Sequence, residues 1–127
     1  MSKVSAIQLN SGPNVKVNLY DVKTFIEQIA DLGSKMVVLP ENFALMPEND
    51  ADYIKHAEEL GDGQIQNYLS DLASSYKIWI VGGTIPIKSK DKDRVMASTI
   101  TFNEKGEQVS LYNKIHLFDV TLPKSKE

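Results

Sequence analysis

Two short apolar runs separated by an amphipathic segment constrain the fold of this chain most strongly. Residues 4–9 form the first run, and residues 36–39 form the second, which stops at Pro40. The first run predicts a strand, and the second is typical of a buried parallel strand. Asn14 or Asn18 can cap the intervening helix, and Gly33 suits its C-terminal end. A strand, a helix and a strand within about 39 residues predict a βαβ unit. The helix face consists of Val15, Leu19, Val22, Ile26, Ile29 and Ala30, spaced by three and four.

A second segment of helix and strand follows, and a loop with a short helix near residues 51–59 precedes it. Asp62 is positioned to cap the second helix, and residues 78–81 are a further buried strand. Gly82 and Gly83 close this strand, either as ordinary turn residues or because another backbone segment approaches them closely. The apolar face of this helix consists of Ile65, Leu69, Leu72 and Tyr76.

The last third of the chain changes to a period of two, which is typical of strands. Met96, Ile100 and Phe102 share one strand face, residues 103–106 form a turn, and a second strand follows. We therefore expect a β-hairpin, which makes the sheet mixed and the fold class α/β. The charged segment before it carries Lys88, Lys90, Lys92 and Arg94 with two aspartates, and we interpret it as a solvated loop.

Composition narrows the possible functions. The 127 residues suffice for one domain at about 100–200 residues per domain. The net charge is 14 − 17 = −3, which argues against a nucleic-acid partner. No apolar run is long enough to span a membrane and no secretory leader is recognisable, so we expect a cytoplasmic protein. The chain has no cysteine, which excludes disulfides, cysteine-bound metals and a thiol nucleophile of its own.

Two charged residues occupy positions where chemistry is possible. Glu41 follows directly after the apolar run at residues 36–39, and ligands of open α/β sheets bind beyond the carboxyl ends of such strands. A partly desolvated glutamate there could act as a general base. Lys114 lies at the end of the hairpin among apolar neighbours and could stabilise an oxyanion. The alternatives are a solvated loop glutamate and a lysine whose ammonium reaches water.

At these residues the chain resembles the nitrilase or carbon–nitrogen hydrolase superfamily, and its Nit-like amidase branch in particular. The resemblance runs from Val4 to Pro123 and rests on four strings in order: VSAIQL, KMVVLPENF, GGTIP and YNKIHLFD. It implies a four-layer α-β-β-α sandwich, of which residues 1–127 would be a truncated N-terminal half. It also implies hydrolysis of non-peptide carbon–nitrogen bonds in small linear amides, with ω-amides of keto-dicarboxylates as one possibility, and no cofactor.

The family uses a Glu–Lys–Cys set, and matching the strings assigns the catalytic base to Glu41 and the oxyanion-stabilising lysine to Lys114. The resemblance further suggests Phe43 as a substrate contact and His116 as a supporting residue. The cysteine would follow Lys114 in the family and is absent here. We find no replacement nucleophile and no metal-ligand spacing, so these 127 residues are expected to be inactive alone.

Three readings of the function stay open at this point. The chain is part of a small-amide hydrolase, or a non-catalytic half-domain that binds a partner or a small acyl ligand, or an unrelated small α/β protein. If half of a sandwich is missing, strand edges and apolar faces should be uncovered. We then expect the chain to associate with a second copy or with a C-terminal half.

Overall fold

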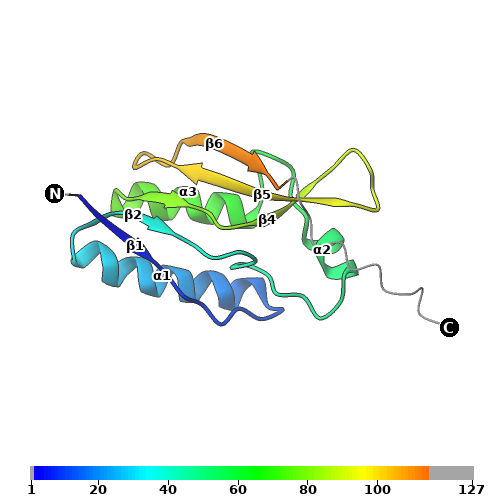
Figure 1. The fold of residues 1–127 in the computed structure, drawn as a ribbon, viewed down its shortest axis with the longest axis horizontal. Helices are drawn as coiled ribbons and strands as arrows, with labels where there is room; N and C mark the ends of the chain where they lie inside the picture. Colours follow the sequence, from blue (N-terminus) through cyan, green and yellow to red (C-terminus); the bar gives the residue numbers. More distant parts are fainter. Residues whose placement is uncertain (1, 115–127) are drawn as a thin grey trace.

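The computed structural model describes residues 2–114, which form one mixed sheet with helices (Figure 1). The strands are β1 (Lys3–Ala6), β2 (Ser34–Val38), β3 (Trp79–Val81), β4 (Ile85–Lys88), β5 (Val95–Phe102) and β6 (Gln108–Asn113). The helices are α1 (Val15–Asp31), α2 (Ala51–His56) and α3 (Gln64–Tyr76). The predicted α/β class, βαβ unit and hairpin are confirmed. None of these helices is long and apolar enough to cross a bilayer.

The sheet is parallel in its first half and antiparallel in its second. β1, β2 and β3 pair in parallel in that order, and β5 and β6 form the antiparallel hairpin. β3 and β4 both pair with the same strand, β5. Ile80 faces Phe102 in this ladder, whereas Ile85 faces Ser98, so the register shifts by one residue between β3 and β4. β3 and β4 are therefore one strand line interrupted by an irregular step at Gly82–Thr84.

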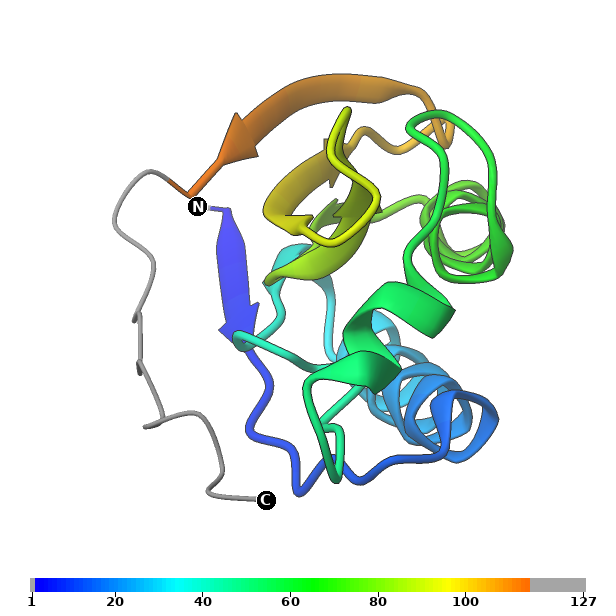
Figure 2. The ribbon, with the colours of Figure 1, turned by 90° about the vertical axis from the view of Figure 1, so that its right-hand side faces the viewer.

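Helices α1 and α3 lie on the same face of the sheet and bury their apolar stripes against it (Figure 2). The Asn14 side chain accepts a hydrogen bond from Val17 N and caps α1, which selects one of the two predicted caps. Asn18 is instead buried, and its amide donates to Ala44 O at 2.8 Å. The core between sheet and helices includes Leu19, Val22, Ile26, Val37, Leu69, Ile80, Ile100 and Phe102.

No described helix packs on the opposite face of the sheet. Residues paired across a ladder point to the same side, so the register places one apolar row on this face. Val4 is 63% exposed and Tyr112 is 54% exposed, which is high for large side chains on a sheet. The row consists of Val4, Met36, Val38, Trp79, Val81 and Tyr112.

The prediction that Asp62 caps the second helix is wrong, because a more distant carboxylate occupies that place. Glu58 accepts hydrogen bonds from Ile65 N at 2.6 Å and from Gln66 N at 3.1 Å, at the start of α3. Gly63 stands at the N-cap position, and any Cβ there would overlap the Glu58 carboxylate. Asp62 accepts a bond from the Asn67 side chain instead. A glycine thus makes room for a cap that no local motif reveals.

Replacing Glu58 with glutamine should destabilise the fold by about 1 kcal/mol, because it removes the negative charge and one of the two acceptors at the helix start. Urea unfolding followed by far-ultraviolet circular dichroism measures this change. Glu59→Gln is the matched control, since Glu59 is largely exposed and makes only a surface pair with Lys88, which contributes little. Equal midpoints for the two variants would contradict the assigned cap.

Candidate functional site

Glu41 lies in a tight loop that leaves the end of β2. Leu39 N donates to Val81 O at 3.0 Å and so extends the pairing with β3 just beyond β2. Asn42 then adopts a positive φ of 55°, a conformation that asparagine tolerates better than most residues. The chain therefore turns sharply after Glu41, whose carboxylate stays more than half exposed.

Three side chains hold this loop from outside. Asn42 N donates to Thr84 Oγ1 at 2.9 Å, which ties the turn to the step between β3 and β4. Ser11 Oγ donates to Phe43 O at 2.6 Å from the segment before α1. Together with the buried amide of Asn18 on Ala44 O, these bonds fix the backbone on both sides of the turn.

Gly83 brings the loop directly against the sheet. It has a φ of +46°, and a Cβ at this position would overlap Pro40 O and approach the Phe43 ring to 2.9 Å. Of the two readings of the glycine pair, close approach of another backbone segment is the one that applies to Gly83. The loop carrying Glu41 rests on this glycine.

Lys114 directly follows β6, the strand that pairs with β5 on the edge away from β3 and β4. Its backbone N donates to Ala97 O at 2.9 Å, which continues the β5–β6 ladder beyond β6. The neighbouring Asn113 accepts a bond of 2.6 Å from the buried hydroxyl of Ser98. These two contacts hold the end of β6 in register and direct Lys114 from a fixed backbone position.

The ammonium of Lys114 lies 2.6 Å from Glu41 Oε1, although 73 residues separate the two in sequence. In the sheet, the β3–β4 line and β5 lie between β2 and β6. The Glu41 loop crosses part of this width, because it bonds to Thr84 rather than staying above its own strand. Thr99 Oγ1 donates to Gly83 O and fastens the same step to β5. The two charged residues that the sequence singles out therefore lie in direct contact in the structure.

The side chains of Glu41 and Lys114 are partly exposed to water, so a small molecule can contact them. The Lys114 side chain is 33% exposed and that of Glu41 is 57% exposed. A carboxylate beside an ammonium can accept a proton while the cation stabilises a negative oxygen. The geometry is therefore compatible with a base beside an oxyanion partner, and the 127 residues contain no cysteine.

Tyr53, on α2, stands near this pair and was not predicted. Burial raises the pKa of its phenol above the ordinary value, and the nearby carboxylates of Asp50 and Glu41 raise the pKa further. Hydrogen bonding with the Asn42 side chain and the charge of Lys114 act in the opposite direction. A tyrosine phenol is neutral at neutral pH even at its ordinary pKa, and the raised pKa moves its ionisation further from that pH. Tyr53 is therefore a candidate hydrogen-bond donor near the pair.

Nothing in the local sequence marks Tyr53 as part of this site, because it reaches the site only through the path of the folded chain. Thr84 lies within the GGTIP string, but its hydrogen bond with Asn42 N also depends on that path. Phe43 is fully buried beside Gly83, so a contact with substrate stays a prediction. His116 lies outside the described residues. Between residues 2 and 114 there is no group of three or more histidine or acidic side chains that could hold a metal ion.

A family model and individual proteins of known sequence match this chain over most of its length. Residues 3–127 match the family model described as carbon-nitrogen hydrolase. The deaminated glutathione amidase of Yersinia enterocolitica is 37% identical over 122 residues, which cover 95% of this chain and 42% of that protein. The omega-amidase NIT3 of Saccharomyces cerevisiae is 37% identical over 127 residues, covering 95% of this chain and 43% of that protein.

A solved structure extends the similarity to three dimensions. The crystal structure of Saccharomyces cerevisiae Nit3, a member of branch 10 of the nitrilase superfamily, superposes with a TM-score of 0.80 at 35% identity. The superposition covers 92% of this chain and 45% of that chain. The chain thus spans less than half the length of the relatives it matches.

Proposed function

Because this chain belongs to the carbon–nitrogen hydrolase family, in its Nit-like branch, we propose that it provides the base and the oxyanion-stabilising cation of an amidase. The observation that carries this proposal is the 2.6 Å contact between Glu41 and Lys114 at the end of the sheet. The substrates are small linear amides, and ω-amides of keto-dicarboxylates are the class to test first, since one relative is an omega-amidase. A cytoplasmic location, which the sequence predicts, belongs to the same proposal.

In the proposed reaction, Glu41 takes the proton of a cysteine thiol and the thiolate attacks the amide carbon. The carbonyl oxygen becomes negative, and the ammonium of Lys114 donates a hydrogen bond to it. The proton held by Glu41 passes to the amide nitrogen, which leaves as ammonia, and a thioester remains. Water, deprotonated by Glu41, then hydrolyses the thioester to the acid and the free thiol.

The thiol has to come from other polypeptide, because these 127 residues contain no cysteine. We propose that the chain is the N-terminal half of an α-β-β-α sandwich and that it contributes one sheet with its helix layer. The uncovered apolar row containing Val4 and Tyr112 supports this proposal, since a second sheet would bury it. That sheet comes from a C-terminal half, and association of two copies is the alternative.

The absence of a cysteine also favours a second candidate function. A half-domain without a nucleophile can still bind a partner or a small acyl ligand beside Glu41 and Lys114. Such a binding module would associate with a C-terminal half or a ligand without releasing ammonia. Association and turnover therefore have to be measured separately.

Co-expression with the part of the Yersinia enterocolitica relative that follows its matched region tests the proposal. We expect the two polypeptides to elute together in size-exclusion chromatography and to release ammonia from an ω-amide of a keto-dicarboxylate, whereas the chain alone releases none. Co-elution without ammonia from this or other short amides would favour the binding module. Separate elution would contradict the proposed half-sandwich.

A further inference from the structure

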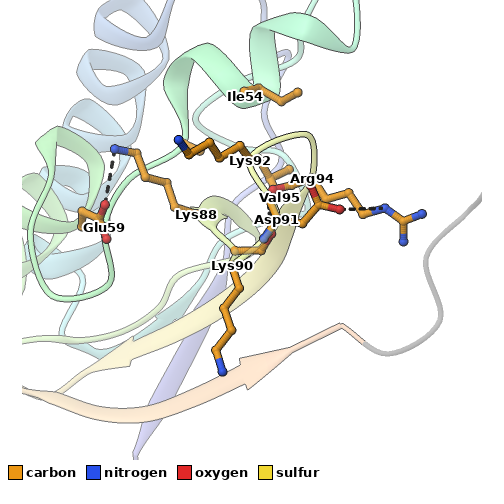
Figure 3. Close-up of a pocket in the computed structure, with 10 residues that line it drawn as sticks. Ile54, Glu59, Lys88, Lys90, Asp91, Lys92, Arg94 and Val95 are labelled. Atoms are coloured by element: carbon orange, nitrogen blue, oxygen red, sulfur yellow. Dashed lines mark hydrogen bonds and ion pairs between the residues drawn. The ribbon is translucent and has the colours of Figure 1, made fainter.

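A cavity of about 600 Å³ opens between the end of α2 and the loop that joins β4 to β5 (Figure 3). Its volume lies within the range of about 300–1,000 Å³ that is usual for small-molecule sites. Neither Glu41 nor Lys114 lines it. Its walls combine an apolar part, formed by Ile54, Ala57 and Val95, with a basic part from the loop.

The loop that carries the basic residues is held by its own hydrogen bonds. Ser89 Oγ donates to Arg94 O at 2.8 Å and closes the loop across its base. Asp93 N donates to the Asp91 carboxylate at 2.9 Å. Ser89 is therefore fixed at one end of a short closed turn, and the side chains between it and Arg94 leave from a defined backbone.

The four cations that line the cavity differ in what they face. Lys88 lies 3.4 Å from the carboxylate of Glu59, and Arg94 lies 3.8 Å from Asp91. In Figure 3, Arg94 and Lys90 point away from Lys88, whereas Lys92 extends along the same side of the loop as Lys88. Lys92 has no acidic partner among residues 2–114. Lys90 also lines the cavity and has no acidic partner among these residues, but it points away from Lys88. On the side of the loop that Lys88 occupies, the ammonium of Lys92 is therefore the one without a counter-charge in the described part of the chain.

The charges at this side of the cavity define the ligand that fits. Arg94 and Asp91 offset each other as an ion pair, and Lys90 points away from Lys88. On the Lys88 side, Lys88 and Lys92 contribute two positive charges and Glu59 contributes one negative charge, which leaves one positive charge. A ligand with a single negative charge neutralises it, whereas a doubly charged phosphate monoester would leave an excess. The apolar side chain of Ile54 and its neighbours offers a surface to a short hydrocarbon segment.

We propose that this cavity binds a small aliphatic monocarboxylate, with the carboxylate at Lys92 and the hydrocarbon segment against Ile54 and Val95. The site is separate from the Glu41–Lys114 pair and does not depend on the proposed amidase function. Because Lys92 is exposed and the cavity is open, we expect weak binding with a dissociation constant on the order of 1 mM.

Titration of the 127-residue chain with butyrate, followed by amide chemical shifts in ¹H–¹⁵N NMR at constant ionic strength, tests this proposal. We expect saturable shifts confined to residues 54–59 and 88–95. Butyramide has the same shape without the charge, and acetate has the charge without the hydrocarbon segment. Butyramide should cause no saturable shift, and acetate should bind at least about five-fold more weakly than butyrate.

Lys92→Gln should weaken butyrate binding at least about five-fold, whereas the matched Lys90→Gln should weaken it less than about two-fold, since Lys90 lines the cavity but points away from Lys88. Equal losses in the two variants would mean a general effect of loop charge and would overturn the proposal. So would tighter binding of inorganic phosphate than of butyrate, or the absence of saturation with butyrate.

Discussion

Replacing Glu41 with glutamine is expected to lower amide hydrolysis by about 10²- to 10⁴-fold in the complex of this chain with a cysteine-bearing C-terminal half. Glutamine keeps the size and a hydrogen-bond acceptor but cannot take a proton from a thiol. The attack step then depends on the small fraction of the cysteine that is already a thiolate at the assay pH. Ammonia release under saturating and limiting amide separates kcat from KM, and we expect the loss mainly in kcat.

The loss should not come from unfolding. The Glu41–Lys114 pair is partly exposed to water, and ion pairs of this kind contribute about 0–1 kcal/mol to stability. Glu48→Gln serves as the matched control, because Glu48 is an exposed residue a few positions further along the same segment and makes no ion pair among residues 2–114. It should retain full activity. Full activity of the Glu41→Gln complex would show that another group is the base.

The elements with clear periodicity could be predicted from sequence, because their pattern reflects which face they bury. α1 and the β5–β6 hairpin lie within a few residues of their expected bounds. The residue that caps α3 could not be predicted, since the cap is Glu58 rather than the adjacent Asp62. Glu58 reaches the helix start because Gly63 has no side chain in its way. The sequence also did not predict that β3 and β4 form one strand line, because this depends on their pairing with the same strand, β5.

For the site, too, some features could be predicted from the sequence and others could not. The motif strings pointed to Glu41 and Lys114, and their contact is present in the structure, whereas their catalytic roles stay proposals. The means by which the two meet was not predictable. It depends on the hydrogen bond that the backbone N–H of Asn42 donates to Thr84 Oγ1. It also depends on the irregular step in the β3–β4 line, where Thr84 lies. Such tertiary hydrogen bonds leave no periodic signal in the sequence.

Substituting Gly83 by alanine is the structural change with the largest expected effect. The positive φ of this residue costs an alanine about 1–2 kcal/mol. The added Cβ also overlaps Pro40 O and crowds the Phe43 ring, and forcing atoms into a packed site costs about 1–3 kcal/mol more. We expect a total loss of about 3 kcal/mol in the free energy of unfolding, measured with urea.

Gly33→Ala separates these two causes. Gly33 also has a positive φ, of +83°, but a Cβ there would meet nothing within 4 Å. Its loss therefore reports the backbone conformation alone, and the excess loss in Gly83→Ala reports the contact with the Glu41 loop. Because a few kcal/mol is a large part of the stability of a small domain, the excess should be easy to resolve. Equal losses would mean that the loop moves away without cost. The position of Glu41 would then not depend on Gly83, and the ion pair with Lys114 would depend on the hydrogen bonds that Thr84, Ser11 and Asn18 make with the loop.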